Sequence, residues 1–363
     1  MRHDRAMESL TPRVALPPSS STLLIIDEQS QIGGARRCAV ELAHICGLSA
    51  DAIGRLAIAV TELATNIIRH AGRGVMVLRA LRSESSPAVE VLALDNGPGI
   101  PDVRRAMRDG FSTSGTAGEG LGGVQRLADM FEIYSQRGNG TALVARVGDR
   151  PRSLARTGQE SSLEDRLGVV CVPLRGETEC GDAWHIVAGP RFVSVLLVDG
   201  LGHGPDAAAT AAIATTLFPR LAKGPPEATL LQVSEAMRAS RGAALSVAVI
   251  DEAARLTRFS GVGNVDGRVL ADGRTEHLIP QNGIVGHAMP TVQQSNAPWP
   301  AGARLVMHSD GITSRWRLDA YPGLITAHPA LVAGVIYRDF QRDRDDATVL
   351  VLADASAEER IPT

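Results

Sequence analysis

The sequence predicts an α+β protein built from two domains. The chain has 363 residues, and an average domain takes roughly 150. Residues 148–162 are polar and rich in Gly, Pro and Ser, as linkers are. Helical and strand patterns alternate before this stretch, whereas apolar strands dominate after it. We therefore predict domains at 22–147 and 163–355, joined by the linker 148–162 and flanked by tails at 1–21 and 356–363.

Composition and charge exclude several classes of protein. The formal net charge is −3, so no concentrated basic field favours nucleic acid or acidic membranes. Aromatic residues make up 3% of the chain, too few for platforms that stack single-stranded nucleic acid. The four cysteines lack the CxxC spacing of many zinc sites, which fits a reducing compartment. Neither a signal-peptide pattern nor an apolar run of roughly 18 residues occurs, so we expect a cytoplasmic protein.

The elements of the first domain follow from periodicity and turn residues. Ser49 or Asp51 is a typical N-cap and Gly72 a typical stop, so the apolar pattern between them predicts one helix. The Gly-Asn-Gly at 138–140 separates two strand patterns and predicts a β-hairpin. We expect helices at 33–46, 49–71 and 124–131, and strands at 75–82, 88–94, 131–137 and 141–147.

Two polar clusters in this domain have the chemistry of a phosphate site. Glu62 and Asn66 lie four residues apart and therefore share a helix face. An amide oxygen suits Mg²⁺ and a carboxylate can act as a base, although a solvated polar face is the simpler alternative. Asp95 ends an apolar strand and is followed by Gly97 and Gly99. Its carboxylate could accept a hydrogen bond from an exocyclic amine such as that of adenine, although an ordinary turn is the alternative.

A glycine-rich segment at 110–123 precedes the expected third helix. A loop of this kind at a helix N-terminus presents free N–H groups to phosphate, but flexible surface loops have the same composition. Taken together and in this order, the three clusters favour a nucleotide site over three unrelated surface features.

The three clusters resemble the N, G1 and G2 boxes of the GHKL ATPase superfamily. Within it, the segment DNGPGIPDVRRAMRDGFSTSGTAGEGLGGVQRLADMF is most similar to the stressosome switch serine kinases of the RsbT type. The resemblance implies the GHKL (Bergerat) helix–sheet sandwich and binding of ATP with Mg²⁺. It implies Glu62 as the catalytic base, Asn66 as the Mg²⁺ ligand and Asp95 as the adenine-binding carboxylate. It also implies nucleotide contacts from Gly97, Gly99, Ser112, Thr113, Gly118, Gly120, Gly122 and Thr141.

Carboxylates follow or precede the apolar strands of the second domain. We expect strands at 167–174, 192–198, 243–250, 303–308 and 347–352, and helices at 205–222 and 226–239. Two further Asp-Gly pairs, at 266–267 and 272–273, are expected to form hairpin turns. Several converging carboxylates would repel one another unless divalent metals lay between them. The candidates are Asp182, Asp199, Asp310, Asp345 and Asp346.

The ordered set GD, DGxGHG, SDG and DDAT resembles the PP2C-type phosphatases of the SpoIIE and RsbX branch. The resemblance implies an α-β-β-α sandwich with two Mn²⁺ or Mg²⁺ ions. Asp199 would bridge the ions and take part in catalysis, with the Gly200 carbonyl on one ion. Asp182, Asp310 and either Asp345 or Asp346 would complete the set, and the distance to the next strand favours Asp345. His203 is expected to structure its loop rather than to act as a general acid.

The two resemblances together imply a bifunctional signalling regulator. It would phosphorylate and dephosphorylate Ser or Thr of STAS-domain proteins in a stressosome-like, partner-switching complex, and a homodimer is compatible with this reading. In the alternative, the phosphatase alone turns over and the ATP-binding domain only sequesters a partner, in the manner of an anti-sigma factor. Glu62 favours the first interpretation, because a purely binding domain needs no base.

Overall fold

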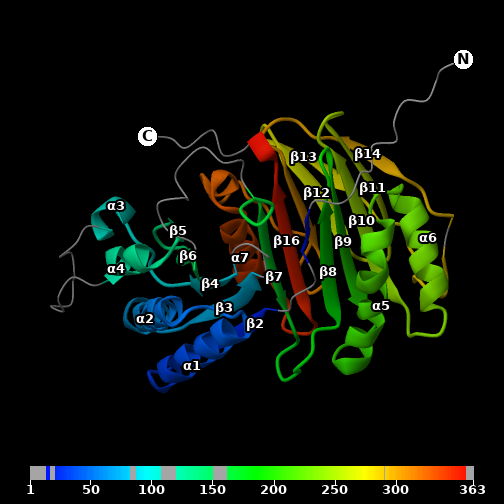
Figure 1. The fold of residues 1–363 in the computed structure, drawn as a ribbon. Coiled ribbons are helices and arrows are strands. Elements are labelled where there is room, and N and C mark those ends of the chain that lie inside the picture. The colour runs from blue at the N-terminus through cyan, green and yellow to red at the C-terminus, as the bar shows by residue number, and fades with distance from the viewer. Residues whose placement is uncertain are drawn as a thin grey trace, which may run out of the picture. The chain divides into compact units, whose positions relative to one another are not determined.

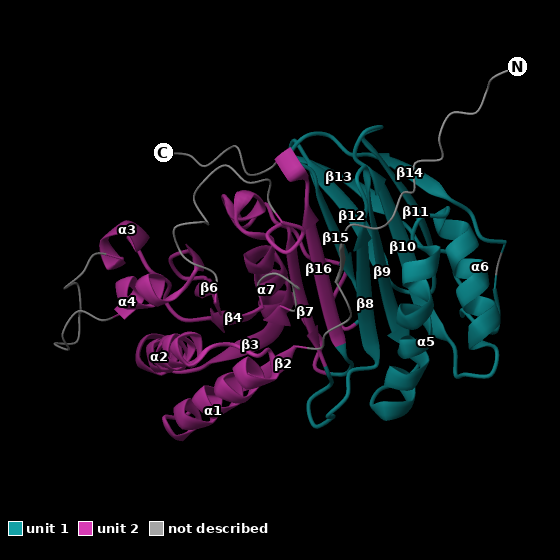
Figure 2. Ribbon diagram, in the orientation of Figure 1, with its two compact units in different colours: residues 1–18, 173–310, 344–346 teal, residues 19–172, 311–343, 347–363 magenta. Residues whose placement is uncertain are grey.

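The computed structural model describes residues 14–16, 21–81, 87–107, 120–149, 162–289 and 291–356. The chain divides into two compact units (Figure 2). Unit 1 comprises residues 1–18, 173–310 and 344–346, and unit 2 comprises residues 19–172, 311–343 and 347–363. The boundary between the units does not coincide with the expected linker, because strands and a helix that follow the linker in the sequence belong to unit 2 together with the N-terminal sandwich. The domain limits at 22–147 and 163–355 therefore stay a prediction.

The N-terminal part of unit 2 is a helix–sheet sandwich (Figure 1). Its antiparallel strands follow the order β2-β3-β4-β6-β5 in the described part of the chain. Two long helices, α1 and α2, cover one face of this sheet and bury small and branched apolar side chains against it. The elements are β2 (Thr22–Ile26), α1 (Ser30–Ile45), α2 (Ala50–Asn66), β3 (Gly74–Leu81), β4 (Ala88–Asp95), α3 (Val103–Ala106), α4 (Gly120–Leu127), β5 (Met130–Ser135) and β6 (Thr141–Gly148).

Local sequence signals set the limits of α2. The Ser49 hydroxyl accepts a hydrogen bond from the Ala52 N–H, which confirms Ser49 as the N-cap. After Asn66 the chain continues as a π-helical turn to Ala71, and Gly72 ends it with φ of 76°. The helix expected at 124–131 is wrong in position, because α4 begins at Gly120 and the sheet already resumes at Met130.

Unit 2 also contains elements that follow the expected linker in the sequence. Strands β7 (Leu167–Val172) and β16 (Ala347–Ala353) pair antiparallel. Helix α7 (Pro329–Phe340) packs against this pair and also against β4 and β6 of the sandwich. Every residue of α7 from Pro329 to Tyr337 is buried, and the sequence did not predict this helix. A short 3-10 helix, Leu324–Thr326, precedes it.

Unit 1 contains a mostly antiparallel set of strands covered by two helices. In the described residues one sheet has the order β1-β8-β9-β10-β11-β14, and three further strands follow the order β13-β12-β15. Helices α5 and α6 bury Phe218 and Met237 against the first sheet. The elements are β1 (Val14–Leu16), β8 (Asp182–Ala188), β9 (Phe192–Gly200), α5 (Pro205–Leu221), α6 (Pro226–Met237), β10 (Ala243–Asp251), β11 (Leu256–Val262), β12 (Asp266–Ala271), β13 (Arg274–Leu278), β14 (Ser295–Pro298) and β15 (Arg304–His308).

The two expected Asp-Gly hairpins have different outcomes. Asp272 and Gly273 have φ of 50° and 73° and form the turn between β12 and β13, as expected. The expectation for Asp266 and Gly267 is wrong, because both residues belong to β12 and pair with β15. Within the described residues, no helix is both long and apolar enough to span a bilayer.

Candidate active sites

The acidic cluster in unit 1 begins with two paired strands. Asp182 at the start of β8 lies directly opposite Asp199 near the end of β9. The Ser309 hydroxyl donates to Asp182 Oδ2 at 2.6 Å, and the Asn264 side-chain amide donates to Asp310 Oδ2 at 2.6 Å. Neighbouring polar side chains therefore hold two of these carboxylates in place.

Electrostatics show that the five expected carboxylates share one site. Burial raises the pKa of Asp199 to about 9, and the negative charges of the other four aspartates act in the same direction. These are Asp182, Asp310, Asp345 and Asp346. Such a group favours a cation, although no three of the described acidic, His or Cys side chains form a ready-made coordination set.

The two adjacent aspartates before β16 have different surroundings. Asp346 is buried, and its two carboxylate oxygens accept the N–H groups of Leu174 at 2.6 Å and Gly181 at 2.8 Å. It therefore braces two loops. Within the described part of the chain, the Asp345 carboxylate accepts a hydrogen bond only from the Asp346 N–H, at 2.9 Å. This difference supports Asp345 rather than Asp346 as the residue able to meet a metal ion.

The loop after Asp199 depends on close packing and on one polar pair. A Cβ atom on Gly200 would lie 2.4 Å from the Ala207 carbonyl oxygen, so no larger residue fits. The His203 ring nitrogen Nδ1 lies 2.7 Å from Glu177 Oε1. This contact agrees with the expected role of His203 in holding the loop.

The second candidate site is the turn after β4. Asp95 Oδ1 accepts the Gly97 N–H at 2.8 Å, and Thr141 lies directly opposite Asp95 on β6. Burial raises the pKa of Asp95, although the Gly97 and Thr141 N–H groups and the positive charge of Arg338 oppose this effect. Gly99 has φ of 70°, and a Cβ there would lie 2.2 Å from the Gln136 carbonyl oxygen. The Asp-Asn-Gly-Pro-Gly turn is thus closely fitted against the β5–β6 hairpin.

The remaining expected nucleotide contacts are only partly described. Glu62 and Asn66 are half-buried and lie one turn apart near the end of α2. Gly120 and Gly122 lie in the first turns of α4. Ser112, Thr113 and Gly118 lie outside the described residues, so their expected phosphate contacts stay predictions.

Sequence reasoning missed some residues that support these sites. Ser309 stands beside Asp310, and its hydroxyl could have been considered as a partner for another carboxylate. No local pattern in the sequence indicates a role for Arg338. Its guanidinium Nη1 donates to the Asp95 carbonyl oxygen at 2.9 Å, although the two residues are 243 positions apart in the sequence.

Comparison with known proteins identifies two families in the chain. Residues 26–147 match the histidine kinase-like ATPase domain, and residues 190–353 match the stage II sporulation protein E (SpoIIE) family.

Individual relatives fall into the same two groups. The serine/threonine-protein kinase RsbT of Bacillus subtilis (strain 168) is 40% identical over 114 residues, which are 31% of this chain and 86% of that kinase. The phosphoserine phosphatase RsbX of the same organism is 25% identical over 138 residues, which are 38% of this chain and 69% of that phosphatase. A crystal structure of RsbX in complex with magnesium has 21% identity and a TM-score of 0.46, and the match covers 51% of this chain and 94% of that one.

Proposed function

Because the chain belongs to the RsbT family of serine/threonine-protein kinases and also carries a SpoIIE-type phosphatase domain, we propose that it adds and removes phosphate on one partner protein. The N-terminal domain transfers the γ-phosphate of ATP to Ser or Thr. The SpoIIE-type domain hydrolyses the resulting phosphoester. The partner is a STAS-domain protein of a stressosome-like complex in the cytoplasm.

The observation that carries the phosphatase assignment is the convergence of five carboxylates around Asp199. Burial, together with the negative charges of the other four aspartates, raises the pKa of Asp199 to about 9, and such a group of carboxylates favours the binding of cations. Two Mn²⁺ or Mg²⁺ ions would supply Lewis acidity and a water of lowered pKa. Asp199 would lie between the ions, with Asp182, Asp310, Asp345 and the Gly200 carbonyl around them. Asp346 would hold the surrounding loops.

The kinase assignment is supported by the turn at Asp95 and the polar end of α2. The Asp95 carboxylate, held by the Gly97 N–H, would accept a hydrogen bond from the amino group of adenine. Asn66 would bind Mg²⁺ through its amide oxygen, and Glu62 would take the proton of the attacking hydroxyl. The glycine-rich segment 110–123 would offer backbone N–H groups to the phosphates.

The experiment combines the full chain with ATP, Mg²⁺, Mn²⁺ and a panel of STAS-domain proteins. Wild-type protein should release inorganic phosphate continuously while the phosphorylated partner stays below stoichiometric. Asp199→Ala should drive the partner to full phosphorylation, and Glu62→Ala should only dephosphorylate it. If Asp199→Ala and wild type accumulated equal phosphorylated partner, the two activities would have different targets.

The alternative function is sequestration, in which the ATP-binding domain holds a partner without phosphorylating it. It predicts an ATP-dependent complex with no labelled phosphate on the partner, even with the phosphatase inactivated by Asp199→Ala. The same experiment therefore separates the two functions.

A further inference from the structure

Helix α7 lies between the strand pair β7–β16 and the helix–sheet sandwich of unit 2. It lies against β4 and β6 on the sheet face opposite α1 and α2. A Cβ atom on Gly334 would lie 2.9 Å from Leu94 Cδ2, so the helix and strand β4 pack as closely as a glycine allows. Leu94 directly precedes Asp95, the candidate adenine-binding residue.

Near its C-terminal end, α7 reaches the nucleotide turn through Arg338. The guanidinium Nη1 donates to the Asp95 carbonyl oxygen at 2.9 Å. Asp339 holds the other side of the same guanidinium, with Nε–Oδ1 at 2.8 Å and Nη2–Oδ2 at 2.7 Å. The Tyr321 hydroxyl in turn donates to Asp339 Oδ2 at 2.9 Å. The Arg338 side chain is only 5% exposed, so its position is fixed by these contacts rather than by water.

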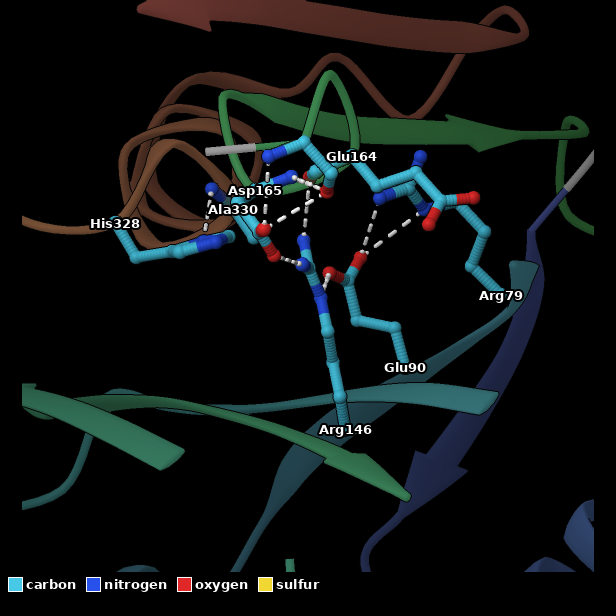
Figure 3. Close-up of polar contacts among 8 residues, drawn as sticks. Arg79, Glu90, Arg146, Glu164, Asp165, His328 and Ala330 are labelled. Atoms are coloured by element: carbon cyan, nitrogen blue, oxygen red, sulfur yellow. Dashed lines mark hydrogen bonds and ion pairs between the residues drawn. The ribbon is translucent and has the colours of Figure 1, made fainter. Parts of the chain in front are cut away.

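The N-terminal end of α7 is anchored separately. Glu132 on β5 accepts the His328 N–H at 2.9 Å. Close to His328, the buried Glu90 pairs with Arg79 and Arg146, and Arg146 pairs with Asp165 (Figure 3). His328 and Arg338 are ten residues apart, which is about 15 Å along a helix. The two ends of α7 are thus held on the sheet by independent contacts.

We propose that Arg338 is a positioning residue of the nucleotide site, which fixes the main chain at Asp95 and thereby sets the preference for adenine over guanine. The inference rests on the proposed ATP site and adds to it a residue from outside the ATPase-like region. Residues 1–150 alone would therefore bind ATP with reduced selectivity.

The physical reason is the position of the carbonyl group that Arg338 holds. Asp95 ends β4, and its carbonyl leads directly into the Asn-Gly-Pro-Gly turn. The hydrogen bond from the Arg338 guanidinium to the Asp95 carbonyl oxygen limits rotation of the peptide group after Asp95. The Asp95 carboxylate therefore stays in the position in which it accepts the Gly97 N–H. The Arg338 charge also favours the ionised carboxylate, which is the form that accepts from an amino group. Guanine carries a carbonyl oxygen where adenine has this amino group, so a well-placed carboxylate rejects it.

The test measures the affinity of the full chain for ATP and for GTP by calorimetry. In wild type, ATP should bind more tightly than GTP. Arg338→Ala should weaken ATP about tenfold, the loss expected when one charge-assisted hydrogen bond is removed, and leave GTP nearly unchanged. Asp339→Asn should shift the ratio in the same direction by a smaller factor, because the guanidinium keeps its bond to Asp95 but loses its rigid clamp.

The matched control is Glu132→Ala, which removes a contact of the same helix at its other end. It should leave the ATP-to-GTP ratio unchanged even if the unfolding temperature falls. Equal weakening of both nucleotides by Arg338→Ala would reduce Arg338 to a structural residue and overturn the inference, as would an unchanged ratio. Failure of wild type to bind either nucleotide would overturn the proposed ATP site, and this inference with it.

Discussion

The buried charges around Glu90 allow a quantitative prediction for Glu90→Gln. Glu90 is 1% exposed, and its carboxylate oxygens lie 2.8 Å from Arg79 Nη2 and 2.8 Å from Arg146 Nε (Figure 3). Glutamine keeps the shape but removes the charge, so two arginines remain in the interior without their shared partner. Removing one member of a buried ion pair costs about 3–5 kcal/mol of the free energy of unfolding.

The pKa of Glu90 gives an independent estimate of the same quantity. Burial opposes ionisation, but Arg79, Arg146 and His328 outweigh it and lower the pKa from its ordinary 4.5 to about 2. That difference corresponds to about 3 kcal/mol at neutral pH. Because the folded-state pKa is the lower one, this stability is present above pH 4.5 and is lost as the pH falls towards 2. Between pH 7 and pH 3 the wild type should lose about 2 kcal/mol of its advantage over Glu90→Gln.

Urea unfolding followed by circular dichroism measures both effects. Asp165→Asn is the matched comparison, because Asp165 pairs with the same Arg146 but is 38% exposed, and should cost only about 1 kcal/mol. Replacing Arg79, Glu90 and Arg146 together by Met, Leu and Met should restore much of the stability, since Asp165, which then loses its partner Arg146, is 38% exposed and can be solvated. The role of Glu90 as the buried partner of two arginines would be refuted if Glu90→Gln cost less than about 1 kcal/mol and the difference in stability from wild type did not depend on pH.

Three further predictions concern the candidate sites. Asp345→Asn should abolish phosphatase activity at an unchanged unfolding temperature. Asp346→Asn should instead cost about 2 kcal/mol of stability, because the N–H group of Leu174 or Gly181 loses its acceptor. Equal effects of both changes on stability would contradict the assignment. The Mn²⁺ concentration for half-maximal phosphatase activity should fall as the pH rises from 7 to 9. The reason is that Asp199, with its pKa of about 9, must release a proton before it binds metal. A Mn²⁺ requirement that did not change with pH would contradict the role of Asp199 as a ligand. Glu62→Ala should retain ATP binding in calorimetry but transfer no labelled phosphate, and residual transfer near the wild-type rate would exclude Glu62 as the base.

Local signals in the sequence determined much of the fold and of the candidate sites. Ser49 and Gly72 set the limits of one helical segment because capping depends on a few neighbouring backbone groups. Asp199 and Asp310 could be expected to share a site because each stands at the end of an apolar strand, and Asp182 joins them from the start of β8. The Gly-Asn-Gly sequence predicted the β5–β6 hairpin because a tight turn is determined by the few residues that form it.

Only the tertiary structure decided which residues support these sites. From Pro329 to Tyr337 the sequence of α7 is apolar on all sides, because every residue of this stretch is buried, so it lacks the periodicity by which an amphipathic helix is recognised. The roles of Asp345 and Asp346 separate only once Leu174 and Gly181 come within hydrogen-bond distance. The contact of Arg338 with Asp95 spans 243 residues, and long-range contacts of this kind follow from how the elements pack rather than from any local pattern.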